Sequence, residues 1–422
     1  MRDSIDLIIG KKRFPLSLET VINFYLVWYL AVDVLNGLFL KVLDFGEAIS
    51  FGQMSRILIL ILLNVYFFLI NKKFSFNIAL SYFYFGFCLF SYYLINDFSL
   101  KYIPKEVIYF TKISTYPLIF LYAYSVVKDE RFVHRMVSVT FWIYAGSIAI
   151  TFLTGTGLGG YNYYAASKGF FYATNATAII GLSLGMYYLF HRKDILFSLL
   201  VLVVLFLSGS KVFLVFILFI GYHYFLKFLK GLRQAKSSVF LYILVIVMLI
   251  VGSGVVYQKV WVERYKVRVE SVLINAERAG LFDQKDLFSY YAFISYERAV
   301  NSKEAILTLN SNWQHYLTGL GYYYTKYGIF EESRFGKDDI ESDFFDMLIM
   351  YGLIGLGLFF LFHLTIMFNV ERTILPMVIV VFLYAIVAGH LVFNPMSYTL
   401  PAVLFGFYFR SGKGVAENQI TN

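Results

Sequence analysis

Long apolar stretches separated by short polar connections run along most of this chain of 422 residues. An α-helix needs roughly 20 apolar residues to cross about 30 Å of hydrocarbon, and segments near that length recur about twelve times, some of them short or interrupted. They cover residues 18–40, 57–70, 76–95, 107–127, 133–153, 170–190, 195–207, 212–226, 239–257, 344–368, 374–391 and 398–409. The pattern predicts an all-α integral membrane protein with about twelve transmembrane helices.

One long polar stretch interrupts this pattern. It divides the chain into residues 1–257 with nine helices, a loop over 258–341, and residues 342–422 with three helices and a tail. Within the loop, apolar positions at helical spacing predict amphipathic helices over 261–279 and 287–309. Glycines and charges over 317–339 indicate a mobile flap. Any chemistry is therefore expected on the side of the membrane that carries this loop.

Composition agrees with a membrane protein: 59% of the residues are hydrophobic, 20% are aromatic and 15% are charged. The single cysteine, Cys88, excludes disulfides within the chain. The six histidines are scattered without metal-ligand spacing, so we expect neither a metal nor another cofactor. The first apolar segment is too long and aromatic for a cleavable signal peptide, and we expect it to remain as an anchor.

The net charge of +9 is explained by membrane topology rather than by a nucleic-acid partner. Alternate connections hold Arg2, Lys11, Lys12, Arg13, Lys72, Lys73, Lys128, Arg131, Arg135, Arg192, Lys193, Lys227, Lys230, Arg233, Lys236, Arg372, Arg410 and Lys413. The opposite short loops hold only Lys41, Arg56, Lys101, Lys105, Lys168 and Lys211. Because cytoplasmic loops carry the excess of Lys and Arg, both termini are predicted to be cytoplasmic and the 258–341 loop extracytoplasmic.

Lys211 is the most informative polar residue within the apolar segments. It follows the break Ser208-Gly-Ser210 at the outer end of a predicted helix. A lysine at the bilayer centre costs roughly 2.5 to 3.5 kcal/mol, so such residues tend to be functional or to lie near an interface. Lys211 is either a cation that faces an outward cavity or an interfacial lysine that snorkels to the surface.

Carboxylates gather where the long loop enters the next helix, at Asp338, Asp339, Glu341, Asp343 and Asp346. Acidic groups at a helix start are favourable to the helix dipole, which explains some of them without any chemistry. Glu341 and Asp343 are nevertheless expected in the same outer layer as Lys211. A cation that binds phosphate and a carboxylate that accepts a proton are the two groups that glycosyl transfer from a lipid diphosphate requires.

Several short motifs occur in a defined order around the long loop. They are Gly169-Phe-Phe-Tyr-Ala-Thr-Asn175, Ser208-Gly-Ser-Lys211, Tyr296-Glu-Arg298 through Ala305, Gly319-Leu-Gly321, Glu341-Ser-Asp343, Tyr351-Gly-Leu-Ile-Gly355, and Gly389-His390 with Asn394-Pro395. This order resembles the Wzy polysaccharide polymerase and O-antigen ligase superfamily, in particular its capsule and exopolysaccharide branch. The resemblance covers residues 161–409 approximately.

The resemblance implies a role for each of these positions. Lys211 and Arg298 stand where cations that hold a pyrophosphate are expected; lysine keeps the charge but lacks the bidentate geometry of arginine. The ligases of the family have a histidine before the last helices, where this chain has Glu341 and Asp343. That departure favours a polymerase, with one of these two carboxylates as the catalytic base. Asn175, Tyr296 and His390 are implied as further substrate-binding residues.

The function that follows is a metal-independent glycosyl transfer in a bacterial cytoplasmic membrane. The donor and acceptor would be glycans linked to undecaprenyl pyrophosphate, and a flippase and a chain-length regulator are the implied protein partners besides membrane lipids. Aromatic residues of the loop, among them Trp313 and Tyr322–Tyr324, would either stack on sugar rings or pack internally. Two alternatives stay open: a flippase or other transporter for lipid-linked oligosaccharides, and a ligase that attaches finished chains.

Overall fold

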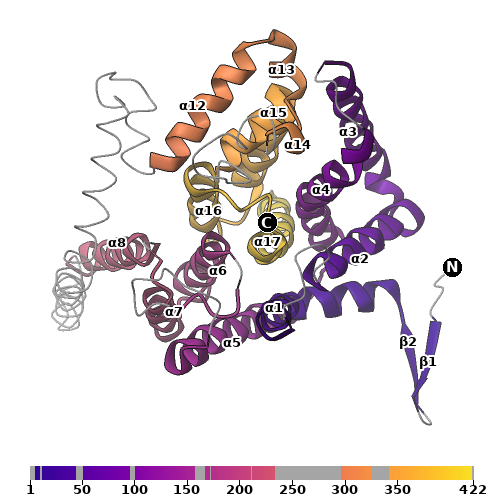
Figure 1. The fold of residues 1–422 in the computed structure, drawn as a ribbon. Helices are drawn as coiled ribbons and strands as arrows, with labels where there is room; N and C mark the ends of the chain where they lie inside the picture. Colours follow the sequence, from indigo (N-terminus) through magenta and orange to yellow (C-terminus); the bar gives the residue numbers. More distant parts are fainter. Residues whose placement is uncertain are drawn as a thin grey trace.

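The computed structural model of the protein describes residues 5–9, 12–43, 51–95, 100–156, 167–171, 173–210, 212–232, 296–325 and 342–420. The α-helices are α1 (Leu18–Leu43), α2 (Phe51–Val65), α3 (Ser75–Ile95), α4 (Ile103–Ser125), α5 (Glu130–Thr154), α6 (Thr174–Met186), α7 (Ile195–Leu207), α8 (Val212–Leu232), α12 (Tyr296–Asn310), α13 (Trp313–Thr318), α14 (Tyr322–Tyr324), α15 (Asp343–Asn369), α16 (Leu375–Ala388) and α17 (Pro395–Ile420). Short π or 3-10 turns are η1 (Tyr66–Ile70), η2 (Lys72–Phe74), η3 (Leu100–Tyr102) and η4 (Tyr187–Arg192). Figure 1 shows these helices in one bundle.

The length and hydropathy of these helices define a multi-pass membrane protein. Among the described residues, five helical stretches are long and apolar enough to cross a membrane. They are Leu18–Phe39, Phe51–Ile70, Lys72–Leu94, Glu130–Thr154 and Asp343–Asn369. Shorter apolar helices are Ile195–Leu207, Val212–Tyr224 and Leu375–Val387.

Most of each predicted apolar segment is helical where the structure describes it, although α6 begins only at Thr174 and α16 ends at Ala388. The segment predicted over 133–153, for example, is α5, and the one over 344–368 is α15. The segment over 239–257 and the loop helix over 261–279 lie outside the described residues. The number of twelve membrane crossings therefore stays a prediction.

One short hairpin is an exception to the all-α prediction. Strand β1 (Ile5–Ile9) pairs antiparallel with β2 (Lys12–Leu16), and Ile5 lies opposite Leu16. The period-two spacing of Ile5, Leu7 and Ile9 suits a strand. This stretch is only five residues long and was not distinguished beside the long apolar segments. The hairpin extends away from the helices (Figure 1).

Helix α17 runs through the centre of the bundle. It packs against α4, α6 and α1, and its first half is buried (Figure 1). The closest approach is to α4 at Gly406, where an added Cβ would lie 2.4 Å from the carbonyl oxygen of Phe120. Because lipid gives helices no hydrophobic reason to associate, such small residues and close contacts hold membrane helices together.

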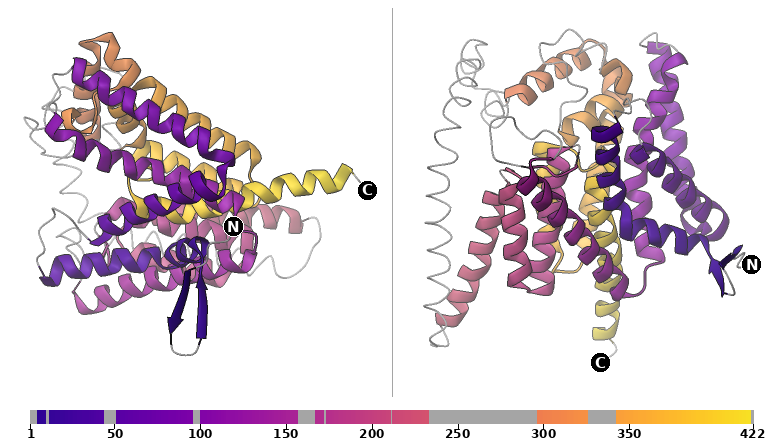
Figure 2. Two further views of the ribbon diagram at one scale, coloured as in Figure 1. Left: turned by 90° about the vertical axis from the view of Figure 1, so that its right-hand side faces the viewer. Right: turned by 60° about the horizontal axis from the view of Figure 1, so that its bottom comes forward.

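The two ends of the bundle are distinct. Helices α12 and α13 lie at one end, and the C-terminal end of α17 lies at the other (Figure 2). We refer to these ends as the α12 face and the opposite face. Within the loop predicted over 258–341, the structure describes residues 296–325, and α12 overlaps the helix predicted over 287–309 and ends one residue beyond it.

Helix α2 begins earlier than predicted, and this changes the position of one charge. The apolar segment was expected from residue 57, with Arg56 in a short loop, but α2 starts at Phe51 and includes Arg56. The Nη2 atom of Arg56 lies 2.6 Å from Oδ1 of Asp33 on α1. Because the two charges are paired, the helix can carry Arg56 inside an apolar stretch.

Candidate functional site

The predicted site residues lie on several elements, and not all of them are described. Lys211 and Glu341 lie outside the described residues. Tyr296 begins α12, and Arg298 follows in its first turn, partly buried and next to the fully buried Ala299. Helix α12 contacts α15, the helix that begins at Asp343. Arg298 and Asp343 are thus on neighbouring helices at the α12 face.

Two of the glycine motifs meet at a break in α15. Gly352 has φ 68° and ψ −170°, which interrupts the helix. The backbone N–H of Leu320 donates to the carbonyl of Ile349 at 2.6 Å, and the N–H of Gly321 donates to that of Met350 at 3.2 Å. Residues 319–321 of the loop therefore pair with the broken turn of a membrane helix.

This crossing requires glycine on both sides. An added Cβ on Gly352 would lie 2.4 Å from the carbonyl oxygen of Leu317, and one on Gly319 would lie 2.4 Å from the carbonyl carbon of Met350. Gly319 also has a left-handed φ of 76°. Glycine is the residue that tolerates both the conformation and the close backbone approach.

Tyrosines of α3 satisfy the carbonyls that the break leaves without helical partners. The hydroxyl of Tyr84 donates to the carbonyl of Tyr351 at 2.6 Å. The hydroxyl of Tyr92 donates to the carbonyl of Met350 and lies 3.0 Å from that of Thr318. Since a buried carbonyl without a partner is costly, these contacts stabilise the broken helix and join α3, α13 and α15.

Glu106 of α4 holds the next part of the loop. Its side chain is fully buried, and its two oxygens accept the backbone N–H groups of Tyr322 at 3.1 Å and Tyr323 at 2.7 Å. Tyr322 also stacks on Tyr109, and Tyr323 stacks on Tyr102, each pair with ring centroids 3.3 Å apart. The sequence alone predicts no site role for Glu106, because its partners lie more than two hundred residues away along the chain.

These contacts bear on two expectations about the loop. Residues 317–325 belong to the stretch expected to form a mobile flap, but they are tied to α3, α4 and α15; the rest of that stretch lies outside the described residues. Tyr322 and Tyr323 each have one ring face covered by a tyrosine of the protein. Trp313 is 69% exposed and is the aromatic residue of α13 that is open to a sugar ring.

Asp343 is brought together with the turn that contains His390. The carboxylate is fully buried, and Oδ2 accepts the backbone N–H groups of Leu391 at 2.8 Å and Val392 at 3.0 Å. Its Oδ1 is buried and has no hydrogen-bond partner among the described residues. The motif at the start of α15 and the motif between α16 and α17 thus form one unit, which the sequence could not show.

His390 has an unusual backbone conformation. Its φ is 68°, directly after Gly389 with φ 67°, and a non-glycine residue in this region costs about 1 to 2 kcal/mol. The hydroxyl of Ser397 donates to the His390 carbonyl. Ser397 is fully buried, whereas His390 is only partly buried. The Ser397 hydroxyl therefore anchors the turn, and the His390 side chain stays partly exposed.

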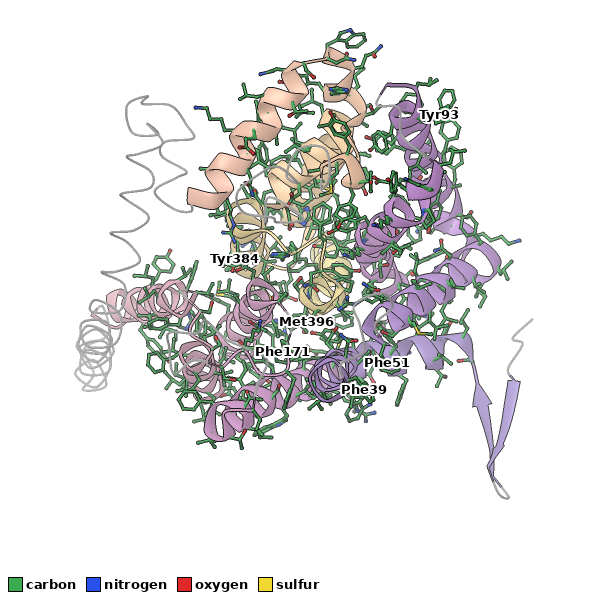
Figure 3. All side chains as sticks on the ribbon, viewed as in Figure 1. Phe39, Phe51, Tyr93, Phe171, Tyr384 and Met396 are labelled. Atoms are coloured by element: carbon green, nitrogen blue, oxygen red, sulfur yellow. The ribbon has the colours of Figure 1, made fainter. Side chains whose placement is uncertain are left out.

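The interior of the bundle is densely packed. Figure 3 shows Met396 and Phe171 inside the bundle, whereas Tyr93 lies at the rim on α3. Met396 is 3% exposed and Tyr93 is 52% exposed. Asn175, in the first turn of α6, is partly buried and follows Phe171 closely in the chain.

Lys168 is a cation to which the sequence analysis gave no role. The N–H of Ser167 donates to the carbonyl of Leu207 at 3.0 Å, which places Lys168 beside the end of α7. Burial lowers the pKa of the Lys168 ammonium, as expected for a partly desolvated cation. Gly209 has a left-handed φ of 69°, so the chain turns here just before Lys211. A cation in this position is suited to an anionic group.

A second polar cluster lies at the opposite face. Residue His191 of η4 accepts or donates a hydrogen bond with Tyr408 of α17 at 2.8 Å and with Thr373 at 2.9 Å. Its ring nitrogens lie 3.6 Å from Glu130 and 3.9 Å from Glu371. This cluster joins the connections before α5, after α6 and between α15 and α16, which were predicted to share one side of the membrane.

Comparisons of this chain with protein-family models, with curated proteins and with solved structures found no match.

Proposed function

We propose that this protein is a bacterial membrane polymerase that joins lipid-linked oligosaccharide repeat units into a surface polysaccharide, at the extracytoplasmic side of the cytoplasmic membrane. The observation that carries the proposal is the pairing of distant motifs at the α12 face. The 319–321 turn contacts the break at Gly352, and Asp343 contacts the turn after His390. These are the motifs on which the resemblance to the Wzy superfamily rests.

The proposed reaction is a displacement at the anomeric carbon of the donor glycan. A hydroxyl oxygen of the acceptor glycan forms the new bond, and the bond from the anomeric carbon to the phosphate oxygen breaks. The leaving undecaprenyl pyrophosphate takes the electron pair, and the hydroxyl proton passes to a carboxylate, for which Glu341 and Asp343 are the candidates. A positioned base contributes about 100- to 10,000-fold to such a step.

Lys211 and Arg298 are the residues proposed to hold the pyrophosphate. Negative charge builds on this group as the sugar leaves, so fixed cations stabilise the transition state more than the ground state. By analogy with other preorganised electrostatic contacts, loss of one of them would lower the rate roughly 100- to 1000-fold. Trp313 at the exposed start of α13 is a candidate platform for a sugar ring.

The break in α15 argues against the transporter alternative. Transporters use unwound helices to present free carbonyls to an ion or substrate at the bilayer midplane. Here the carbonyls of Ile349, Met350 and Tyr351 are occupied by donors from the loop and from α3. The broken helix is therefore better suited to anchor a loop than to bind a transported ion.

Deletion of the gene in its own host, followed by gel analysis of surface polysaccharide and of the lipid carrier, tests the proposal. Loss of a polymerase leaves single repeat units on the carrier. Loss of a flippase would stop units from reaching the outer face, and loss of a ligase would leave long chains unattached. Either of these two outcomes, or unchanged polysaccharide, would reject the polymerase.

Complementation then tests the proposed cations. Lys211→Ala and Arg298→Ala should each fail to restore long chains, whereas Lys303→Ala, which removes a partly buried cation from the same helix as Arg298, should restore them. If both site variants restored normal chain length, the pyrophosphate contact would be assigned to the wrong residues.

A further inference from the structure

The carboxylate of Asp343 is placed to hold backbone rather than to react. It is fully buried, and Oδ2 is already shared between the N–H groups of Leu391 and Val392. A general base must reach the hydroxyl whose proton it accepts, within hydrogen-bond distance or through one water. Among the described residues, Oδ2 is engaged by the turn between α16 and α17 and Oδ1 is buried, so the carboxylate is not exposed to an incoming hydroxyl.

What this carboxylate holds is a strained turn. The two N–H groups that donate to it belong to the residues immediately after His390. The φ of His390 is 68°, which is left-handed. Such conformations persist where surrounding contacts determine them, and they concentrate at functional sites. Two contacts determine the conformation here. Asp343 accepts the N–H groups that follow His390, and the Ser397 hydroxyl donates to the His390 carbonyl.

Further hydrogen bonds hold Asp343 in place. The hydroxyl of Ser342 donates to the carbonyl of Ile386 at 2.6 Å, and Asp346 accepts the N–H of Ser342 at 3.1 Å. The Ser342 hydroxyl thus fastens the start of α15 to the end of α16, and Asp346 holds Ser342 within the first turn of α15. These bonds join the start of α15, the end of α16 and the turn before α17, and the partly buried His390 belongs to that turn.

We propose that Asp343 is a positioning residue that fixes the left-handed turn at His390, so that the imidazole is presented to the pyrophosphate of the lipid-linked donor. This inference rests on the proposed function, and it assigns to Asp343 a role other than that of catalytic base. The imidazole offers a hydrogen-bond donor, and a positive charge when protonated, to an anionic oxygen. Of the two candidate bases, this leaves Glu341 to take the proton of the acceptor hydroxyl.

Asparagine and alanine at position 343 separate the two roles of the carboxylate. Asp343→Asn keeps an oxygen that can accept hydrogen bonds from both N–H groups, but it removes the carboxylate that can take a proton. Asp343→Ala removes both the hydrogen-bond acceptor and the base. A positioning role predicts that Asp343→Asn loses no more than about threefold in chain-forming activity and that Asp343→Ala loses about 100-fold, through misplacement of the site. A base role predicts that both variants are inactive.

Hydrogen exchange of the purified protein in detergent provides a readout that does not depend on activity. The amides of Leu391 and Val392 should exchange about tenfold faster in Asp343→Ala, since a hydrogen bond of ordinary net strength gives about this protection. In Asp343→Asn they should exchange nearly as slowly as in the native protein. Ser397→Ala loosens the same turn from its other side and serves where Asp343→Ala does not fold.

Variants of His390 test what the turn presents. Asparagine tolerates the left-handed region, so His390→Asn keeps the backbone and removes the imidazole. We expect it to raise the KM for the donor about tenfold with a smaller change in kcat, because it removes a binding contact. Any one of three results would overturn the inference. They are a normal KM in His390→Asn, unchanged hydrogen exchange in Asp343→Ala, and an inactive Asp343→Asn whose amides remain protected. If the native protein made no polymer at all, the proposed function would fail, while exchange would still decide whether Asp343 holds the turn.

Discussion

The carboxylate of Glu106 accepts a hydrogen bond of 2.7 Å from the backbone N–H of Tyr323, although 217 residues separate them along the chain. The other oxygen of Glu106 accepts the N–H of Tyr322. The first N–H groups of a helix lack partners within the helix, and a carboxylate is a favourable partner for them. Glu106 therefore caps the short helix α14 from the first turn of α4.

Removal of this cap should release the loop. Glu106→Ala would remove the acceptor of two N–H groups, one buried and one partly buried, and we expect a loss of about 3 kcal/mol in the free energy of unfolding. Equilibrium unfolding in mixed detergent micelles measures the loss, and limited proteolysis should show faster cleavage within residues 313–325.

Glu304→Gln is the matched control for this prediction. Its carboxylate lies on α12 of the same loop and makes no hydrogen bond with the described residues, so stability should change by less than about 0.5 kcal/mol. Equal proteolysis of the native protein and Glu106→Ala would show that α14 is held by other contacts.

Sequence periodicity located the helices because twenty apolar residues in a row have few alternatives in a membrane. The segment predicted over 344–368 and helix α15 differ by a single residue at each end. The interior break at Gly352 was not predicted, because glycine is common in membrane helices and only its partner, the 319–321 turn, shows why it is needed there.

The candidate site was predictable in its parts and not in its pairings. The order of the motifs placed Asp343 and His390 among the site residues, but the sequence does not show that Asp343 accepts the backbone N–H groups of the two residues after His390. Glu106 and His191 were passed over for a similar reason. Each is a single polar residue whose partners come from distant elements.

A second prediction concerns the glycine at the break in α15. Gly352→Ala would add a Cβ 2.4 Å from the Leu317 carbonyl oxygen at a residue with φ 68°, and both effects oppose the native state. We expect a loss of about 3 kcal/mol or more in the free energy of unfolding, together with undocking of residues 319–321. Unfolding in mixed micelles and proteolysis of the loop are the measurements.

The same helix provides the control for this substitution. Gly357→Ala adds a Cβ with nothing within 4 Å and at an ordinary helical position, so it should be neutral or stabilise by about 0.5 to 1 kcal/mol. If the two alanine variants were equally stable, the close crossing between α15 and the loop would not exist.

A third prediction concerns the cluster at the opposite face. His191 and Tyr408 are joined by a hydrogen bond of 2.8 Å between η4 and α17. A double-mutant cycle with His191→Phe and Tyr408→Phe should give a coupling free energy of about 0.5 to 1.5 kcal/mol, because the two side chains share one interaction. A second cycle that pairs Tyr408→Phe with Tyr84→Phe at the α12 face should be additive, and coupling of the same size there would indicate a global effect.

The last prediction concerns the ion pair between Asp33 and Arg56, which are 11% and 23% exposed within two membrane-spanning helices. Truncation of one partner leaves the other charge in apolar surroundings, so Arg56→Met should cost about 2 to 3 kcal/mol, somewhat less than for a fully buried pair. The double variant Asp33→Leu with Arg56→Met replaces both charges by apolar groups and should recover most of this loss. Unfolding free energies of Asp33→Leu, Arg56→Met and the double variant measure this directly, and a double variant as unstable as the sum of the two single variants would show that the two charges do not stabilise each other. Chain length in complemented cells then separates stability from function: if the stable double variant made no long chains, Arg56 would be a further cation of the site.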